Sequence, residues 1–409
     1  MLDNLPVSAS GKSIGPRETV IMLAGLMALN AFAIDAMIPA LPAIGADLHV
    51  ASDNQRQLVV VAYFLGFGST QLLWGPLADR FGRKPILAIG IVLYGLFALL
   101  CGLANSFPLL IAARIAMGAS AAVTRVLVVA MVRDLFEGEA MARVMSLVFM
   151  IFMVVPVVAP SIGQLILLVG SWRLIFLVLT GYALVMGLWS GLRLPETLHP
   201  EFRRALNYAE ISGAIRASLV DRQSLGYTIA LTAVFGGLTA YIASIQQIVF
   251  DAFHAPKALP LIFAAIAAPM ALASWSNSRI VTRFGLRPVG HAGIIAFVIL
   301  TVGHALLALM IAEPLWLFAV AQALVMMSFA FASSNLSTLA MENMAAIAGT
   351  ASSVQGVVGT VGGAAIGFFV GQHFDGTARP FLIGLAVCGV AATAAVFVTE
   401  RGQLMHDPR

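Results

Sequence analysis

Asp35 and Arg114 are ionisable residues whose positions could support ion-coupled chemistry within long apolar stretches. Asp35 lies in the stretch from residue 19 to 41, and Arg114 in the stretch from 107 to 131. A charged side chain at such a depth costs about 2.5 to 3.5 kcal/mol on insertion scales, so it usually faces a polar interior and has a function. At about 1.5 Å of rise per residue, both are expected roughly 9 to 10 Å below the same membrane surface, where they could face each other.

A carboxyl group in that position is acted on in two opposing ways. Burial favours its neutral form and a nearby arginine favours its ionised form, so altered surroundings can make it bind or release a proton. Arg114 stays charged and could tune Asp35 or hold an electron-rich group of a substrate. Asn30 and Tyr63 are further candidates for substrate contact. The competing role for Asp35 is structural, as a cap on the unwound end of its span before Pro39 and Pro42.

Membrane helices must carry these residues. Of the 409 residues, 60% are hydrophobic and 10% are charged, whereas soluble domains have about 25% charged residues. A spanning helix needs roughly 20 mostly apolar residues, and twelve stretches meet that requirement. Their expected bounds are 19 to 41, 57 to 77, 86 to 104, 107 to 131, 144 to 169, 172 to 194, 225 to 250, 258 to 279, 289 to 311, 314 to 340, 347 to 373 and 379 to 399. The predicted fold class is an all-α membrane protein.

The basic residues predict the orientation of these spans. Lys and Arg number 17 in the termini and even-to-odd connections and only 4 on the opposite side. The positive-inside rule therefore places both termini in the cytoplasm. Because these residues are dispersed rather than gathered in one stripe, the net charge of +4 does not indicate nucleic acid. Cys101 and Cys388 lie in apolar runs without metal-ligand spacing, so neither a metal nor a cofactor is expected.

An internal repeat divides the chain into halves. Arg80-Phe81-Gly82-Arg83-Lys84-Pro85 recurs, 203 residues later, as Arg283-Phe284-Gly285-Leu286-Arg287-Pro288. We expect six-helix bundles at residues 1–194 and 225–409, with a substrate site between them near the bilayer midplane. Residues 195–224 would form a cytoplasmic linker. Its segment from 201 to 220 is either an amphipathic surface helix or a solvated chain.

The first copy of the repeat has the composition of a switching loop. Gly75 and Gly82 would allow close approach or a positive φ, and Asp79 could pair with an arginine or cap a helix. With Arg80 and Arg83 they form the candidate gate between spans two and three. A positively charged anchor without a gating role is the alternative.

This loop resembles the GxLaDrxGrkxxl signature of the major facilitator superfamily. Span four, with Arg114 and Gly118, is similar to the second family motif. Span five resembles the third, associated with antiporters, through Pro156, Pro160 and Gly163, with Ala159 and Gln164 at two glycine positions. Together with the segments at residues 35–42 and 170–173, the chain resembles Bcr/CflA-type multidrug/proton antiporters. The resemblance implies a major facilitator fold in the bacterial inner membrane and proton-driven export of drug-like compounds.

The second half offers no clear acid or base in the middle of a span. Tyr241, Gln246 and Asn335 are candidates for substrate contact on a mostly apolar and amide surface, which suits bulky lipophilic cargo. His291 and His304 appear isolated in span nine and are interpreted as packed or interfacial. A stripe of small residues in span eleven would allow two helices to approach closely. Its members are Gly359, Gly363, Gly367 and Gly371.

Three classes of function are compared. The first is export of a small lipophilic, cationic or zwitterionic molecule in exchange for protons, by a monomer that alternates its access. The second is uptake or facilitated diffusion of a metabolite such as a sugar or amino acid. An enzyme or receptor is not expected, because no HExxH, GxSxG or Walker sequence occurs.

Overall fold

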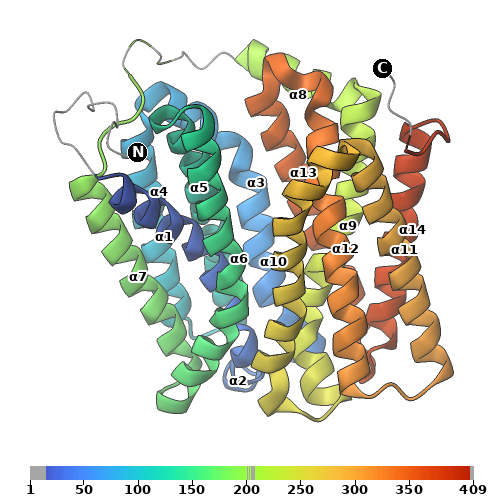
Figure 1. Cartoon of the computed structure of the whole chain (residues 1–409). Coiled ribbons are helices and arrows are strands. Elements are labelled where there is room, and N and C mark those ends of the chain that lie inside the picture. Colours follow the sequence, from blue (N-terminus) through green and yellow to red (C-terminus); the bar gives the residue numbers. More distant parts are fainter. Residues whose placement is uncertain (1–14, 200, 202, 204–207, 406–409) are drawn as a thin grey trace. The chain divides into compact units, whose positions relative to one another are not determined.

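The computed structural model describes residues 15–199, 201, 203 and 208–405, and all regular elements within them are helices (Figure 1). Twelve long helices correspond in order to the twelve predicted spans. They are α1 (Pro16–Asp35), α3 (Leu58–Phe81), α4 (Arg83–Gly102), α5 (Phe107–Leu135), α6 (Gly138–Val169), α7 (Trp172–Arg193), α9 (Arg222–Gln247), α10 (Leu259–Phe284), α11 (Leu286–Met310), α12 (Leu315–Met341), α13 (Ala348–Gln372) and α14 (Arg379–Thr399). The all-α, twelve-helix prediction is confirmed.

Most of these helices are long and apolar enough to cross a membrane on their own. Ten segments of the described chain pass a test of length and hydropathy. One of them, Leu315–Gln372, runs through α12, the short 3-10 helix η6 (Glu342–Ile347) and α13, so it contains two spans. Helix α6 contributes the shorter apolar stretch Val154–Val169.

The chain forms two compact units. Unit 1 contains Met1–Val50 and Ala62–Tyr208, and unit 2 contains Ala51–Val61 and Ala209–Arg409. Helix α8 (Tyr208–Val220) lies within the predicted linker, and its Ser218 hydroxyl lies 3.9 Å from the Met344 sulfur of η6. Residues 202 and 204–207 of the predicted amphipathic segment lie outside the described residues. The division at residues 195 and 224 stays a prediction.

The first span is interrupted where the sequence predicted one segment from 19 to 41. Its α-helix ends at Asp35 and is followed by the 3-10 helix η1 (Ile38–Ala40) and by α2 (Leu41–Asp47). Pro39 explains the break, because proline has no N–H to offer to the carbonyl four residues earlier, which is that of Asp35. The carboxyl-bearing residue therefore lies at a helix end and not within a continuous helix.

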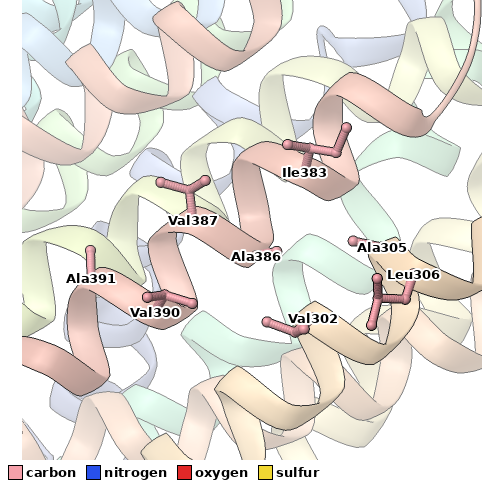
Figure 2. Close-up of a pocket in the computed structure, with 8 residues that line it drawn as sticks. All are labelled: Val302, Ala305, Leu306, Ile383, Ala386, Val387, Val390 and Ala391. Carbon is pink, nitrogen blue, oxygen red and sulfur yellow. The ribbon is translucent and has the colours of Figure 1, made fainter. Parts of the chain in front are cut away.

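The outer surface of the bundles is strongly apolar. Along α7, Leu184 is 63% exposed and Leu192 is 69% exposed. An apolar groove of about 400 Å³ lies between α11 and α14, and Val302, Leu306, Ile383 and Val387 line it (Figure 2). Such surfaces can contact lipid chains without leaving a polar group unpaired, because the backbone groups of a helix are bonded internally.

The predicted glycine stripe of span eleven lies against α9. A Cβ atom built on Gly367 would be 2.8 Å from Cβ of Thr239, and one built on Gly363 would be 3.1 Å from the Phe235 carbonyl carbon. At Gly359 the nearest atom, Phe235 Cδ2, would be 3.9 Å away. The two helices therefore approach most closely at Gly363 and Gly367, where only glycine fits without movement.

The stripe provides a matched pair of substitutions. Gly367→Ala should lower the free energy of unfolding by about 1 to 3 kcal/mol, because the added methyl group overpacks the contact with α9. Gly359→Ala places the same group in ordinary contact distance and should change it much less. Unfolding of the purified protein in mixed micelles measures both. Equal stability of the two variants would contradict the assigned contact.

Candidate functional site

Asp35 is a buried carboxyl group at the break in the first span. Its residue is 3% exposed, and among the described residues no hydrogen-bond partner reaches its Oδ1 atom. The following element, η1, has no side-chain cap. The structural alternative for Asp35, a cap on the unwound end, is not tested by these observations and stays open beside the proton-carrying one. A buried acceptor without a partner costs about 1 to 3 kcal/mol when neutral and more when charged.

Arg114 reaches the same break from α5. It is fully buried, and its Nη1 donates a hydrogen bond of 3.1 Å to the carbonyl oxygen of Ala33, two residues before Asp35. Its guanidinium carbon lies 4.6 Å from the centroid of the Tyr63 ring, within range of a cation–π contact. A cation bonded to the last carbonyls of a helix also opposes the partial negative charge of that end.

Arg114 therefore contacts the helix that carries Asp35. The end of a helix presents carbonyl groups that a guanidinium can satisfy, and the bond to Ala33 is of this kind. Whether the two charged side chains face each other, and whether Asp35 exchanges a proton, stay predictions.

Asn30 and Tyr63 are joined in a short hydrogen-bond chain one turn deeper in unit 1. The Tyr63 hydroxyl donates to Asn30 Oδ1 at 3.0 Å, and Asn30 Nδ2 donates to the Thr124 hydroxyl at 2.7 Å. Both residues are at most 2% exposed. The chain links α1, α3 and α5 beside Arg114. The role of Asn30 and Tyr63 in substrate contact stays a prediction.

The antiporter-like motif of α6 lies against the break. A Cβ atom on Gly163 would overlap the carbonyl oxygen of Ala36, the residue that follows Asp35. Pro156 and Pro160 lie within the same helix, at positions that each remove a backbone donor. The glycine thus allows α6 to contact the peptide next to the carboxyl-bearing residue.

The three candidates of the second half lie in unit 2. Tyr241 of α9 is 4% exposed, and its ring centroid is 5.7 Å from that of Phe263. Gln246, on the same helix, has buried amide atoms that no described residue bonds. Asn335 of α12 exchanges hydrogen bonds with Asn277 of α10, the shorter being 2.8 Å. Their roles in binding substrate remain predictions.

The candidate gate of the first half is a single-residue link between two helices. Helix α3 continues to Phe81, so Gly75, Asp79 and Arg80 are helical and only Gly82, with φ of +101°, turns the chain. The close approach or positive φ that Gly75 would allow is not used there, because the residue is helical and the nearest atom to a Cβ built on it would be 3.8 Å away. Arg80 lies over the Phe81 ring at 5.3 Å.

Two acids that the sequence analysis did not select complete this gate. Arg83 pairs with Asp79 at 2.5 Å and with Asp134 of α5 at 3.3 Å. Glu196 accepts from the backbone N–H groups of Arg83 and Lys84, at 2.9 and 3.3 Å. It thereby caps α4, the role proposed as one alternative for Asp79. The sequence analysis did not select Glu196, because it lies 113 residues from Arg83, in the predicted linker. An acidic side chain is favourable at a helix N-terminus, but the sequence does not show which acid reaches that of α4.

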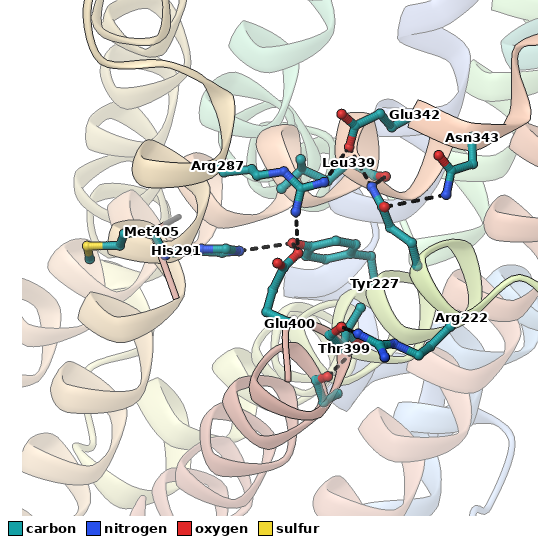
Figure 3. A network of polar contacts seen from close by, with 12 residues as sticks. Arg222, Tyr227, Arg287, His291, Leu339, Glu342, Asn343, Thr399, Glu400 and Met405 are labelled. Carbon is teal, nitrogen blue, oxygen red and sulfur yellow. Dashed lines mark hydrogen bonds and ion pairs between the residues drawn. The ribbon is translucent and has the colours of Figure 1, made fainter. Parts of the chain in front are cut away.

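The second copy of the loop has its own ionic network (Figure 3). Gly285 turns the chain with φ of +85°, and Arg283 lies over the Phe284 ring at 5.3 Å. Arg287 is bonded between Glu342 at 2.7 Å and Glu400 at 2.6 Å. The two copies of the repeat therefore share the positive φ of their glycine as well as their sequence. The acids that bind the two loops come from different segments.

His291 is also part of the second network. Its Nε2 lies 2.9 Å from the Tyr227 hydroxyl, and its Nδ1 accepts from the N–H of Met405 at 2.9 Å. His291 is thus packed, one of the two interpretations that the sequence offered, and its partners lie on α9 and in the segment after α14.

A family model described as Major Facilitator Superfamily matches residues 23–368. The chain belongs to the Major Facilitator Superfamily. It is a multi-pass membrane transporter of this superfamily, and the fold and family that the sequence suggested are confirmed.

Relatives of this major facilitator protein include drug-resistance proteins. It is 31% identical to the bicyclomycin resistance protein homolog of Haemophilus influenzae, over 93% of this chain and 96% of the relative. It is 35% identical to the multidrug resistance protein MdtL of Klebsiella pneumoniae, over 43% of this chain and 45% of MdtL. A crystal structure of a D-xylose-proton symporter matches with a TM-score of 0.72 at 16% identity, covering 92% of this chain and 96% of the symporter, which shows the shared fold alone.

The contact of Gly163 with the break yields a second prediction. Gly163→Ala should displace the Ala36 peptide and lower the thermal midpoint of this major facilitator protein by several degrees, since overpacking costs about 1 to 3 kcal/mol. Gly181→Ala in α7 is the matched control, because nothing lies within 4 Å of a Cβ atom there. Heating followed by size-exclusion chromatography measures both midpoints. A Gly163→Ala midpoint equal to the control would contradict the contact.

Proposed function

We propose that the protein exports drug-like small molecules in exchange for protons by alternating access, with Asp35 as the residue that carries the proton. The substrate would be lipophilic, cationic or zwitterionic. The main support is that Asp35 is buried at a helix break in the membrane-spanning region and that its Oδ1 has no hydrogen-bond partner among the described residues. The drug-resistance names of the relatives support the substrate class.

The proposed cycle depends on the relative stability of the neutral and ionised forms of Asp35 at the helix break. Apolar surroundings and the negative end of α1 disfavour an ionised Asp35, whereas the Arg114 guanidinium favours it. A small change in the position of Arg114 or in access to water would shift the balance between the two forms. Asp35 would bind a proton when open to the outside and release it when open to the inside, with substrate occupying the cavity in exchange.

The proposed moving bodies are the bundles of residues 1–194 and 225–409, and the protein would work as a monomer in a bacterial inner membrane with both termini in the cytoplasm. Asn30, Tyr63, Arg114, Tyr241, Gln246 and Asn335 are the proposed substrate contacts. A membrane potential of 100 mV supplies about 2.3 kcal/mol per proton, which corresponds to about a 50-fold gradient. One proton per substrate is enough for useful export.

Asp35→Asn tests the proton-carrying role. In reconstituted vesicles, substrate should release protons from the wild-type protein and not from the variant, because an amide cannot exchange a proton at this position. Cells that express the variant should lose drug protection by at least about tenfold. Asp53→Asn is the control, since the Asp53 side chain is 79% exposed and pairs with Arg56.

Unchanged proton release in Asp35→Asn would remove that residue from the mechanism. Accumulation of a sugar or amino acid by cells, without drug protection by the wild-type protein, would instead favour the uptake function.

A further inference from the structure

His304 and Glu313 form a buried acid–base pair in unit 2, away from Asp35 in the sequence. His304 Nε2 lies 2.7 Å from Glu313 Oε1, and the two side chains are 2% and 5% exposed. His304 is thus packed, one of the two interpretations that the sequence offered, but its acidic partner was not predicted. Its partner follows nine residues later, beyond the end of α11, where no helical periodicity points to it.

The Glu313 carboxylate is directed inward from an exposed connection. Its neighbours Ala312 and Pro314 are exposed, while its own side chain is almost fully covered. On the inner side the His304 ring lies 5.7 Å from Phe318, which in turn lies 5.4 Å from Phe253 and 6.4 Å from Phe381. An aromatic cluster thus separates the pair from water on that side.

Two atoms of the pair are available for a proton. His304 Nδ1 and Glu313 Oε2 are buried, and neither is bonded by any described residue. With Nε2 committed to the glutamate, a proton can be added at Nδ1. The protonated pair is an imidazolium and a carboxylate with zero net charge, whereas loss of that proton leaves a net charge of −1 in apolar surroundings.

Other charged groups lie near this end of unit 2. Arg379 of α14 donates from Nε to the carbonyl of Ala308, one turn beyond His304 on α11, at 3.2 Å. Asp251 and His254 flank Phe253 in the segment after α9. On α12, Gln322 lies one turn after Phe318 and is fully buried, with amide atoms that no described residue bonds. A polar but uncharged side chain therefore follows the aromatic cluster toward the interior.

We propose that His304 and Glu313 form a second proton-binding site, loaded from the membrane side on which the connection between α11 and α12 lies. The orientation predicted from the basic residues makes this the outer side. The proposal rests on proton-coupled transport as the function. It assigns one exchangeable proton to Asp35 in unit 1 and one to the pair in unit 2, so each cycle carries two protons. The competing role is a structural staple that fixes the connection.

A direct test does not depend on transport. In the purified full-length protein labelled with 15N-histidine, the His304 signal, identified by its loss in His304→Gln, should show Nδ1 gaining a proton as the pH falls from about 8 to about 5. Glu313→Gln should move this titration, because it removes the negative partner. A His304 Nδ1 that keeps one protonation state over this range would overturn the proposal, whether or not the protein couples transport to protons.

Transport then tests the stoichiometry. In vesicles, the reversal potential should give two protons per substrate for the wild-type protein and one for both His304→Gln and Glu313→Gln, with transport retained. His373→Gln is the matched control, because His373 is exposed and the hydrogen bond found for its side chain in the described part of the chain is to the Phe369 carbonyl. An unchanged ratio in both variants would show that the pair is a staple. If the wild-type protein moves substrate without any proton, the proposed function fails, and the imidazole titration still decides the binding site.

Discussion

A buried carboxyl oxygen without a hydrogen-bond partner costs free energy in an apolar bundle. Asp35 Oδ1 is such an atom, and several features of unit 1 meet at this residue. Pro39 ends the helix at this residue, Arg114 bonds the carbonyl of Ala33, and Gly163 lets α6 contact the next peptide. In the proposed mechanism the charge of Asp35 changes during the transport cycle, because burial favours the neutral form and a nearby guanidinium favours the ionised form.

Ionic contacts at the helix ends complement this site. The first loop is bonded to Asp134 and Glu196, and the second to Glu342 and Glu400. Each set links a loop to segments that are distant in sequence, so separating them at that end of the unit requires charged hydrogen bonds to break. Near the membrane surface such contacts are worth little singly and more as a network. The two loops of the repeat are similar but have different acidic partners, so their ionic contacts can differ in strength.

The sequence predicted the twelve helices because length and hydropathy determine a span, and it predicted Gly82 and Gly285 because the loop recurs. It identified Asp35 and Arg114 by their rarity, but it did not predict the bond from Arg114 to the Ala33 carbonyl, since the consequence of the break at Pro39 for nearby carbonyl groups was not considered. Glu196 and Glu313 could not be found in this way. Their partners lie across the fold or beyond a helix end, where no periodicity relates the two positions.

The central claim is that Asp35 holds a proton which substrate displaces. Infrared difference spectroscopy of the purified protein tests it most directly, by following the carbonyl stretch of a protonated carboxyl group as substrate is added. The account predicts that this band is lost on substrate addition in the wild-type protein and that Asp35→Asn lacks the change. A band that persists with bound substrate, or an identical loss in Asp35→Asn, would contradict the account.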